Sequence, residues 1–258
     1  MTGSTAQHAM IDPGGAAVGL PRSVSDLAVF LDVDGTLIDI AETPDAIVVP
    51  PRLPGDLERV RDAASGALAL VSGRSIDFID RMFAPAKLTA IGLHGGEVRE
   101  PDGRLVVMPT PQILAELRPS LTALANRFPG ALLEDKGHSI AVHYRRAPVA
   151  EREIEEAVEA MAASAGGDIV VQKGKKVIEL RPGGSSKGGA VDAMMRISPF
   201  AGRQPIAIGD DVTDEAMFST VNALGGTTIR VGPPDRSTAA RFRIDDPSAV
   251  RDWLASLT

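Results

Sequence analysis

The sequence contains no cysteine, which excludes disulfides, thiolate zinc sites, iron–sulfur clusters and cysteine nucleophiles. Aromatic residues make up only 3% of the chain, which argues against base-stacking platforms and against carbohydrate-binding modules built on exposed rings. No apolar run approaches the ~18 residues of a membrane-spanning helix. Basic residues are not in excess either: 27 Lys and Arg stand against 34 Asp and Glu, a net charge of −7, which disfavours a general nucleic-acid binder.

What is present is the composition of a soluble globular protein, with 44% hydrophobic and 24% charged residues. At ~150 residues per domain, the 258 residues correspond to about 1.7 domains. Residues 1–22 are rich in small residues and lack a basic region followed by an apolar run, so we expect a mobile tail rather than a secretory signal. A cytoplasmic monomer without a membrane or nucleic-acid partner is the default expectation.

Two patterns divide the rest of the chain. Over 23–108 and again over 183–258, short apolar runs alternate with helical segments, which is typical of a parallel sheet covered by helices. Over 109–182, a helix is followed by two strands, and this order then repeats. The sequence therefore predicts a Rossmann-like, doubly wound α/β core that is interrupted by an inserted α+β domain.

Polar residues follow the apolar runs, and ligands of open α/β sheets bind beyond the carboxyl ends of the strands. Asp32 and Asp34 follow the first run, and their i, i+2 spacing on an extended chain points both carboxylates to the same side. Ser72 and Arg74 follow the second run, a hydroxyl donor and a fixed cation. We expect these side chains to meet at one edge of the sheet.

Two further polar groups come from the second half of the chain. Lys187 opens a helix, and the acidic run Gly209–Glu215 follows a strand. Alone, such an acidic run is usually a helix cap with an acidic first turn, and Asp-x-Asp-Gly is often only turn chemistry. Together the four groups supply the residue types of phosphoryl transfer, and their clustered carboxylates suit a hard cation such as Mg²⁺.

These residues resemble known motifs. Asp32-Val-Asp-Gly-Thr36, Ser72, Lys187 and Gly209-Asp-Asp-Val-Thr-Asp-Glu215 are similar to the four motifs of the haloacid dehalogenase superfamily phosphatases. The trehalose-6-phosphate phosphatase family is matched further by Val71-Ser-Gly-Arg74, His94-Gly95, Leu133-Glu-Asp-Lys136-Gly137, Val142-His-Tyr-Arg145 and Lys176-Val-Ile-Glu179. One departure is Gly183, since relatives often carry an arginine there.

The resemblance implies a Mg²⁺-dependent hydrolysis of trehalose 6-phosphate to trehalose and phosphate, the last step of trehalose biosynthesis. It implies that Asp32 is the nucleophile that forms an aspartyl-phosphate, and that Asp34 acts first as acid and then as base. Ser72 and Lys187 would hold the phosphoryl group, and Asp214 would orient Lys187 or a metal-bound water.

Two sets of ligands also follow from the resemblance. The residues expected at the metal are Asp32, Asp34 (through its carbonyl), Asp210 and, behind them, Asp211. The residues expected at the substrate are Arg74, His94, Gly95, Glu134, Lys136, His143, Arg145, Lys175 and Glu179. The inserted domain would act as a cap that selects the sugar. His94 has packing in its loop as the alternative to substrate contact, and His138 is expected to be solvated.

Two other functions stay open from the sequence. One is a different sugar-phosphate phosphatase of the same superfamily, of the sucrose- or mannosyl-phosphate type. The other is a non-catalytic sensor of sugar phosphates. The presence of Asp32, Asp34, Lys187 and Asp210 argues against the sensor, because a binding protein has no use for a nucleophile paired with an acid.

Overall fold

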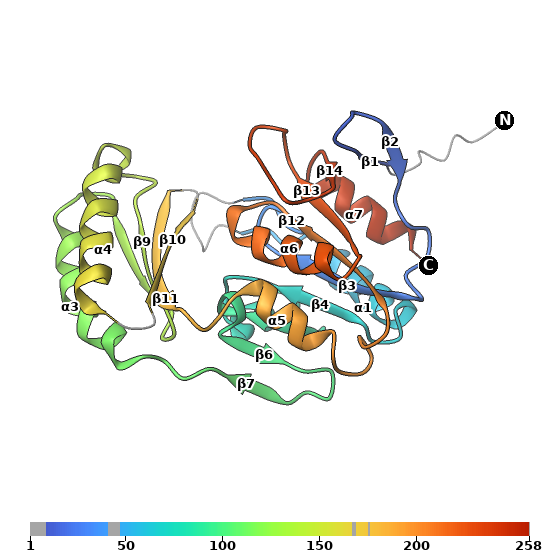
Figure 1. The fold of residues 1–258 in the computed structure, drawn as a ribbon, viewed down its shortest axis with the longest axis horizontal. Coiled ribbons are helices and arrows are strands. Elements are labelled where there is room, and N and C mark those ends of the chain that lie inside the picture. Colours follow the sequence, from blue (N-terminus) through green and yellow to red (C-terminus); the bar gives the residue numbers. More distant parts are fainter. Residues whose placement is uncertain (1–8, 41–46, 167–168, 175, 258) are drawn as a thin grey trace. The chain divides into compact units, whose positions relative to one another are not determined.

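The computed structural model describes residues 9–40, 47–166, 169–174 and 176–257. The chain divides into two compact units. The core unit contains Met1–Val106 and Lys187–Thr258, and the inserted unit contains Val107–Ser186. Figure 1 shows the chain coloured along its sequence.

The core unit is built on a sheet in which the described residues form ten strands, in the order β2-β1-β14-β13-β12-β3-β4-β5-β6-β7. Their bounds are β1 Ala9–Ile11, β2 Ala17–Gly19, β3 Leu27–Asp32, β4 Leu68–Val71, β5 Thr89–Gly92, β6 Glu97–Arg99, β7 Leu105–Val107, β12 Gln204–Gly209, β13 Thr227–Val231 and β14 Phe242–Ile244. The six strands from β14 to β5 in this order run parallel. Since helices cover both faces of such a sheet, β3 and β4 are continuous apolar runs.

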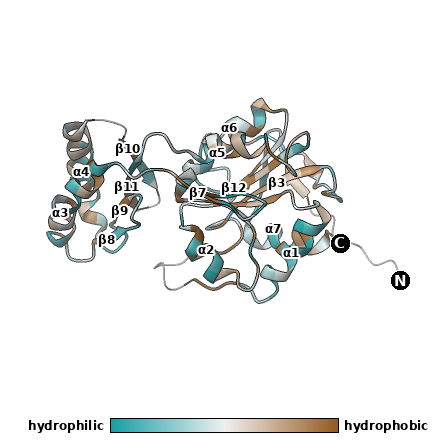
Figure 2. Cartoon of the chain, turned by 90° about the horizontal axis from the view of Figure 1, so that it is seen from below, coloured by the Kyte–Doolittle hydropathy of each residue, from teal (hydrophilic) through white to brown (hydrophobic). Residues whose placement is uncertain are grey.

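Helices cover the core sheet on both sides, as Figure 2 shows edge-on, with α5 and α6 on one face and α1, α2 and α7 on the other. Their bounds are α1 Leu53–Ala63, α2 Ile76–Met82, α5 Lys187–Met194, α6 Glu215–Ala223 and α7 Pro247–Ser256. Phe30 of β3 packs against Phe200 with 5.4 Å between ring centroids, inside one large buried cluster. The doubly wound α/β fold predicted from the sequence is confirmed.

The N-terminal segment differs from the expected tail over residues 9–22. β1 pairs with β14, and β2 extends the same sheet edge. Met10 and Leu20 are buried, and the Trp253 indole donates a hydrogen bond to the carbonyl of Pro21 at 2.8 Å. Strands this short carry little hydrophobic periodicity, and the partner of β1 in the core sheet lies more than two hundred residues away, so no local pattern predicts these strands. Residues 1–8 lie outside the described residues.

Over its described residues, the inserted unit is a four-stranded antiparallel sheet in the order β10-β11-β9-β8, together with two α-helices. Its elements are α3 Gln112–Asn126, β8 Leu132–Asp135, β9 Ile140–His143, α4 Glu151–Ala165, β10 Ile169–Gly174 and β11 Val177–Pro182. Ile154 and Val158 of α4 join Ile140 and Ile178 of the sheet in one buried cluster. The predicted order of helices and strands matches these elements.

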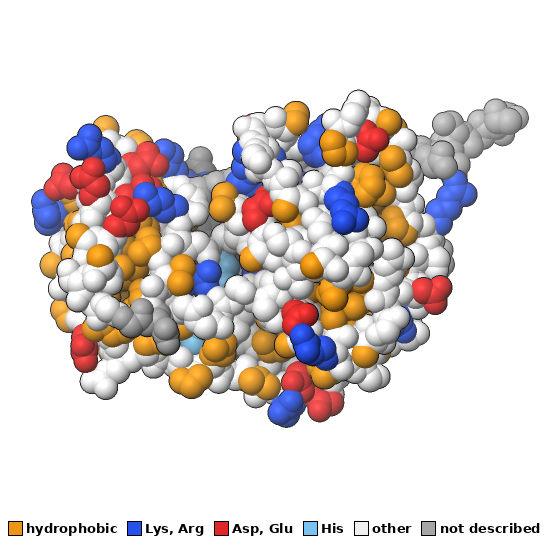
Figure 3. Space-filling model, in the orientation of Figure 1, with side chains coloured by type: hydrophobic (Ala, Val, Ile, Leu, Met, Phe, Trp, Pro, Cys, Tyr) orange, Lys and Arg blue, Asp and Glu red, His pale blue; other side chains and the backbone are white. Residues whose placement is uncertain are grey.

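α4 is rich in glutamate, and Figure 3 shows acidic and basic side chains gathered together at the surface of this part of the inserted unit. Lys173 pairs with Glu155 and Glu159, and Lys176 pairs with Glu151. Much of the acidic charge of this segment is therefore balanced at the surface of the inserted unit. Among the described residues, no helix is both long and apolar enough to span a membrane.

Candidate active site

Asp32 ends β3 at the carboxyl edge of the core sheet. The chain then folds back sharply, because the Gly35 and Ile38 amides donate to the carbonyls of Ile38 and Val33 at 2.8 and 3.1 Å. Gly35 has a φ of +85°, and a Cβ built on it would lie 2.4 Å from a carboxylate oxygen of Asp210. Only glycine fits both the turn and this close approach. The first acidic motif and Asp210 are therefore held against one another.

Lys187, the first residue of α5, lies buried between two carboxylates. Its Nζ donates to Oδ1 of Asp32 at 2.6 Å and to Oδ1 of Asp214 at 2.7 Å. Burial lowers the pKa of Lys187, but the charges of Asp214 and Asp32 outweigh burial and hold this pKa above its usual value. The ammonium is thus a fixed cation at the edge of the sheet.

Asp214 is fully buried, and both of its carboxylate oxygens accept hydrogen bonds. Oδ1 accepts from Lys187, and Oδ2 accepts from the backbone amides of Asp210 and Asp211 at 3.0 Å each. Gly209 leaves room for this carboxylate, since a Cβ there would lie 2.5 Å from the Asp214 Cγ. Asp214 therefore fixes both Lys187 and the backbone of the acidic run.

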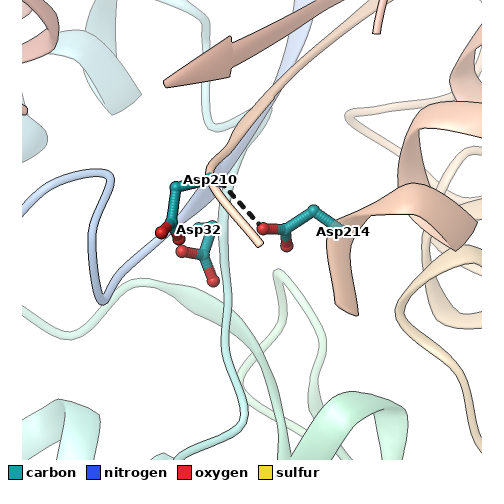
Figure 4. A group of neighbouring side chains, drawn as sticks. All are labelled: Asp32, Asp210 and Asp214. Carbon is teal, nitrogen blue, oxygen red and sulfur yellow. Dashed lines mark hydrogen bonds between the residues drawn. The ribbon is translucent and has the colours of Figure 1, made fainter. Parts of the chain in front are cut away.

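Asp32, Asp210 and Asp214 could hold a metal ion, because one carboxylate oxygen of each lies within 4.8 Å of the others (Figure 4). Burial, together with the charges of Asp214 and Asp210, raises the pKa of Asp32 well above its usual value, although Lys187 opposes the rise. A divalent cation would relieve this repulsion, and carboxylate oxygens are ligands that Mg²⁺ accepts. Because Asp214 already accepts three hydrogen bonds, Asp32 and Asp210 are the better placed ligands.

Asp34 lies apart from this group of three carboxylates. Its two oxygens accept from Nε and Nη2 of Arg74 at 2.6 and 2.7 Å, a bidentate ion pair. The Arg74 guanidinium also lies over the Phe78 ring, 4.5 Å from its centroid. Arg74, which was expected at the substrate, here binds the expected acid and base, and the carboxylate of Asp34 is directed to Arg74.

Asp211, which was expected at the metal, also lies outside the group of three. Its Oδ1 accepts from Nη1 of Arg236 at 3.2 Å, and its side chain caps the 3₁₀ turn Val212–Asp214. The Arg236 guanidinium donates as well to the carbonyl of Asp210. Sequence reasoning missed Arg236, because it stands in a loop without any recognisable motif.

Ser72 and His94 lie side by side at the ends of β4 and β5. The Ser72 hydroxyl accepts from the Arg74 amide at 3.1 Å, and the Ser72 carbonyl accepts from the His94 amide at 3.0 Å. A Cβ at Gly73 would lie 2.5 Å from the buried His94 ring. His94 therefore packs closely in its loop, and Gly95 follows it with a φ of +101°.

In the inserted unit, three of the expected substrate residues lie on one face of its sheet. Glu134 and Glu179 both pair with Ala141 of the intervening strand, so their side chains project to the same side. Nζ of Lys136 donates to Oε2 of Glu179 at 3.0 Å, and the Ser139 hydroxyl donates to Oε1. Glu179 is thus bound on both of its oxygens.

The other residues expected in the inserted unit differ in their surroundings. His143 is hydrogen-bonded to Glu134 at 2.7 Å, and chiefly through this bond it holds the pKa of Glu134 below its usual value despite burial. Arg145 is exposed beyond the end of β9, and Lys175 lies outside the described residues. The expectation that His138 is solvated is wrong. It is 4% exposed, and its Nδ1 lies 3.1 Å from the Thr110 hydroxyl.

Comparison with known proteins covers most of the chain. A family model for trehalose-phosphatase matches residues 30–248. A probable trehalose-phosphate phosphatase of Sinorhizobium fredii is 48% identical over 92% of this chain and 90% of that protein. The trehalose-6-phosphate phosphatase of Escherichia coli is 37% identical over 92% of this chain and 89% of that protein. The C-terminal domain of trehalose-6-phosphate phosphatase from C. albicans has a similar fold, with a TM-score of 0.82 over 90% of this chain and 92% of that one at 21% identity.

Proposed function

This chain belongs to the trehalose-phosphatase family, and on that premise we propose that it hydrolyses trehalose 6-phosphate to trehalose and inorganic phosphate. The observation that carries the proposal is the buried group of Asp32, Lys187 and Asp214 with Asp210 beside it. It combines a nucleophile with a fixed cation and a place for a second cation. These are the requirements of phosphoryl transfer through a covalent intermediate.

In the first step, a carboxylate oxygen of Asp32 bonds to phosphorus while the bond from phosphorus to the sugar oxygen breaks. Once the Asp34 side chain has left Arg74 and taken up a proton, it gives that proton to the departing sugar oxygen. In the second step, water attacks the aspartyl-phosphate, Asp34 takes the proton of that water, and phosphate leaves. Asp32 is thereby restored.

The phosphoryl group would be held by Lys187 and Ser72. The Lys187 ammonium already fixes one oxygen of Asp32, so the nucleophile is held in a single orientation. The Ser72 hydroxyl oxygen accepts a hydrogen bond from the Arg74 amide. The hydroxyl proton therefore remains available to donate to a phosphoryl oxygen.

Asp32 and Asp210 would hold Mg²⁺, together with the carbonyl of Asp34. The fit is supported by the grouping of buried carboxylates and by the space that Gly35 leaves against Asp210. When bound, the cation offsets negative charge on the phosphoryl oxygens. Asp211, held by Arg236, would support the site from behind without contacting the ion.

The inserted unit would act as the cap that selects the sugar, through Glu134, Lys136 and Glu179. Their carboxylates and ammonium group lie on one sheet face and can exchange partners with sugar hydroxyls. His143 would orient Glu134. This assignment depends on the family motifs that these residues match.

The test is phosphate release from trehalose 6-phosphate by the purified full chain with Mg²⁺, compared with sucrose 6-phosphate and a mannosyl phosphate. We expect turnover that the Asp32→Asn variant loses by at least ~10³-fold, since the nucleophile is gone. A tenfold preference for another sugar phosphate would replace the substrate assignment. Normal turnover by the variant would refute the covalent mechanism, and no turnover by the unmodified chain would favour a sensor.

A further inference from the structure

The loop between β13 and β14 contacts the acidic run from two sides. Arg236 reaches the Asp210 carbonyl and the Asp211 carboxylate. A few residues on, the Thr238 hydroxyl and the Ala239 amide donate to the two carboxylate oxygens of Glu215, each at 2.7 Å. The loop therefore forms hydrogen bonds near both the beginning and the end of the acidic run.

Arg236 is itself held in place. The buried Arg230 donates to the carbonyl of Arg236 at 3.3 Å and forms an ion pair with the neighbouring Asp235. The side chain of Arg236 is only 25% exposed. A restrained side chain of this kind loses little conformational entropy when it binds, so its contacts can determine the geometry of the residues that it touches.

Charge explains why a cation is needed at this point. Asp32, Asp210 and Asp214 lie close together, with Asp211 next in the chain, and Lys187 forms ion pairs with Asp32 and Asp214. Arg236 forms an ion pair with Asp211 at 3.2 Å. Without it, the Asp211 carboxylate would repel Asp210 and could compete with it for a bound cation.

We propose that Arg236 is a positioning residue for the divalent-cation site. It fixes the backbone of Asp210 through the carbonyl and holds the Asp211 carboxylate away from the ion. The inference rests on the proposed function, because it takes Asp32 and Asp210 as the metal ligands. Groups that orient metal ligands from behind typically change metal affinity about 10- to 100-fold when they are removed.

The experiment measures Mg²⁺ binding to the full chain by isothermal titration calorimetry, without substrate, in the unmodified protein and in Arg236→Ala and Arg236→Lys. We expect the Kd to rise about tenfold in the alanine variant and by less in the lysine variant, which keeps one donor and the charge. The same ratios are expected for the Mg²⁺ concentration that half-activates phosphate release. At saturating Mg²⁺, the KM for substrate should stay unchanged.

Arg241→Ala is the matched control, because that side chain is exposed and donates to the carbonyl of Asn222 at 3.4 Å instead of to the acidic run. Its Kd for Mg²⁺ should stay within twofold of the unmodified protein. A purely structural role of Arg236 predicts a lower Tm with an unchanged Kd, and this result would overturn the proposal. So would an equal loss of affinity in the Arg241 variant.

Asp210→Asn separates this proposal from the proposed function. If the Asn variant loses Mg²⁺ binding while Arg236→Ala keeps it, only the role of Arg236 fails. If the Asn variant binds Mg²⁺ normally, the assigned metal site fails and the role of Arg236 fails with it. Loss of affinity in both the Asp210 and the Arg236 variants, with the control unaffected, supports both.

Discussion

Each unit of the chain contains a lysine between acidic groups, and the two lysines differ in burial. In the core unit, Lys187 and its partner Asp214 have side chains that are 2% and 0% exposed. In the inserted unit, Lys136 and its partner Glu179 are 16% and 7% exposed. Glu134, paired with His143, is 35% exposed. These charged side chains of the core unit are thus buried, whereas Lys136 and Glu134 of the inserted unit are partly exposed to solvent.

This difference matches what each group would have to do. A fully buried network of ion pairs cannot rearrange without leaving a buried charge unpaired, so it holds the reacting atoms in one geometry. A partly open network can release a carboxylate or an ammonium to a sugar hydroxyl at a smaller cost. We therefore expect substitutions in the core unit to affect stability and the chemical step, and those in the inserted unit to affect substrate affinity.

The largest effect is expected from Lys187→Met. Asp32 and Asp214 would lose their buried cation, which should lower the free energy of unfolding by about 3–5 kcal/mol. Phosphate release should fall about 10³-fold, because the group proposed to hold the phosphoryl oxygens is lost. Urea unfolding and steady-state kinetics measure the two effects.

Two further variants sharpen this comparison. Lys187→Met combined with Asp214→Asn should recover part of the stability and none of the activity, since one uncompensated charge is removed. Lys136→Met is the matched control in the inserted unit, and we expect it to lower the free energy of unfolding by only about 1.5–3 kcal/mol, because Lys136 is partly exposed and Glu179 keeps the Ser139 donor. Equal destabilisation by the two methionine variants would contradict the contrast between the units.

Metal removal is expected to have the next largest effect on stability. Mg²⁺ at 100 times its Kd should raise the free energy of unfolding by about 2.7 kcal/mol relative to protein in EDTA, because the ion would bind carboxylates that are grouped only in the folded state. Phosphate release should stop in EDTA and return with Mg²⁺. Scanning calorimetry with and without Mg²⁺ measures the change in Tm.

Asp210→Asn and Lys136→Met test where the ion acts. The first variant should lose the Mg²⁺-dependent rise in Tm, and the second should keep it in full. A rise in Tm that survives in Asp210→Asn would place the ion elsewhere than between Asp32 and Asp210.

The sequence predicted those parts of the site that sit at the ends of apolar runs. Asp32 ends a buried strand, and Lys187 opens a helix as predicted. In a parallel sheet, the order of runs and helices brings such residues to one edge whatever the details of packing. The grouping of Asp32, Asp210 and Lys187 could therefore be expected without coordinates.

The contacts that the sequence did not predict depend on packing between segments without periodic patterns. Arg236 reaches Asp211 from a loop that follows β13, and β1 pairs with a strand at the far end of the chain. Arg74 and Asp34, which form an ion pair, follow the ends of two different strands. The directions of their side chains depend on the folded backbone and are not predicted by the sequence. Such contacts involve ordinary arginines, and nothing local distinguishes them from solvated ones.

In the inserted unit, Glu179→Gln should lower kcat/KM for trehalose 6-phosphate by about 10- to 100-fold, the range for loss of a charged hydrogen bond. The loss should appear mainly in KM, because Glu179 would contact the sugar and not the phosphoryl group. Hydrolysis of p-nitrophenyl phosphate, which carries no sugar, should stay within twofold. A parallel loss on both substrates would mean that Glu179 serves the fold or the chemistry.

The smallest effect is expected from Ser139→Ala, which removes one of the two donors to Glu179. Both residues are buried, at 2% and 5% exposure, so the loss of one neutral donor should cost about 1 kcal/mol, or roughly a fivefold rise in KM for trehalose 6-phosphate. Ser164→Ala on α4 is the control, since that hydroxyl only returns to its own helix at Ala160. In a double-mutant cycle, Ser139→Ala should add little to Glu179→Gln, because its effect acts through that carboxylate. Fully additive effects would show that Ser139 acts independently of Glu179. The charged residues of the inserted unit would then be separate groups and not one connected hydrogen-bond network.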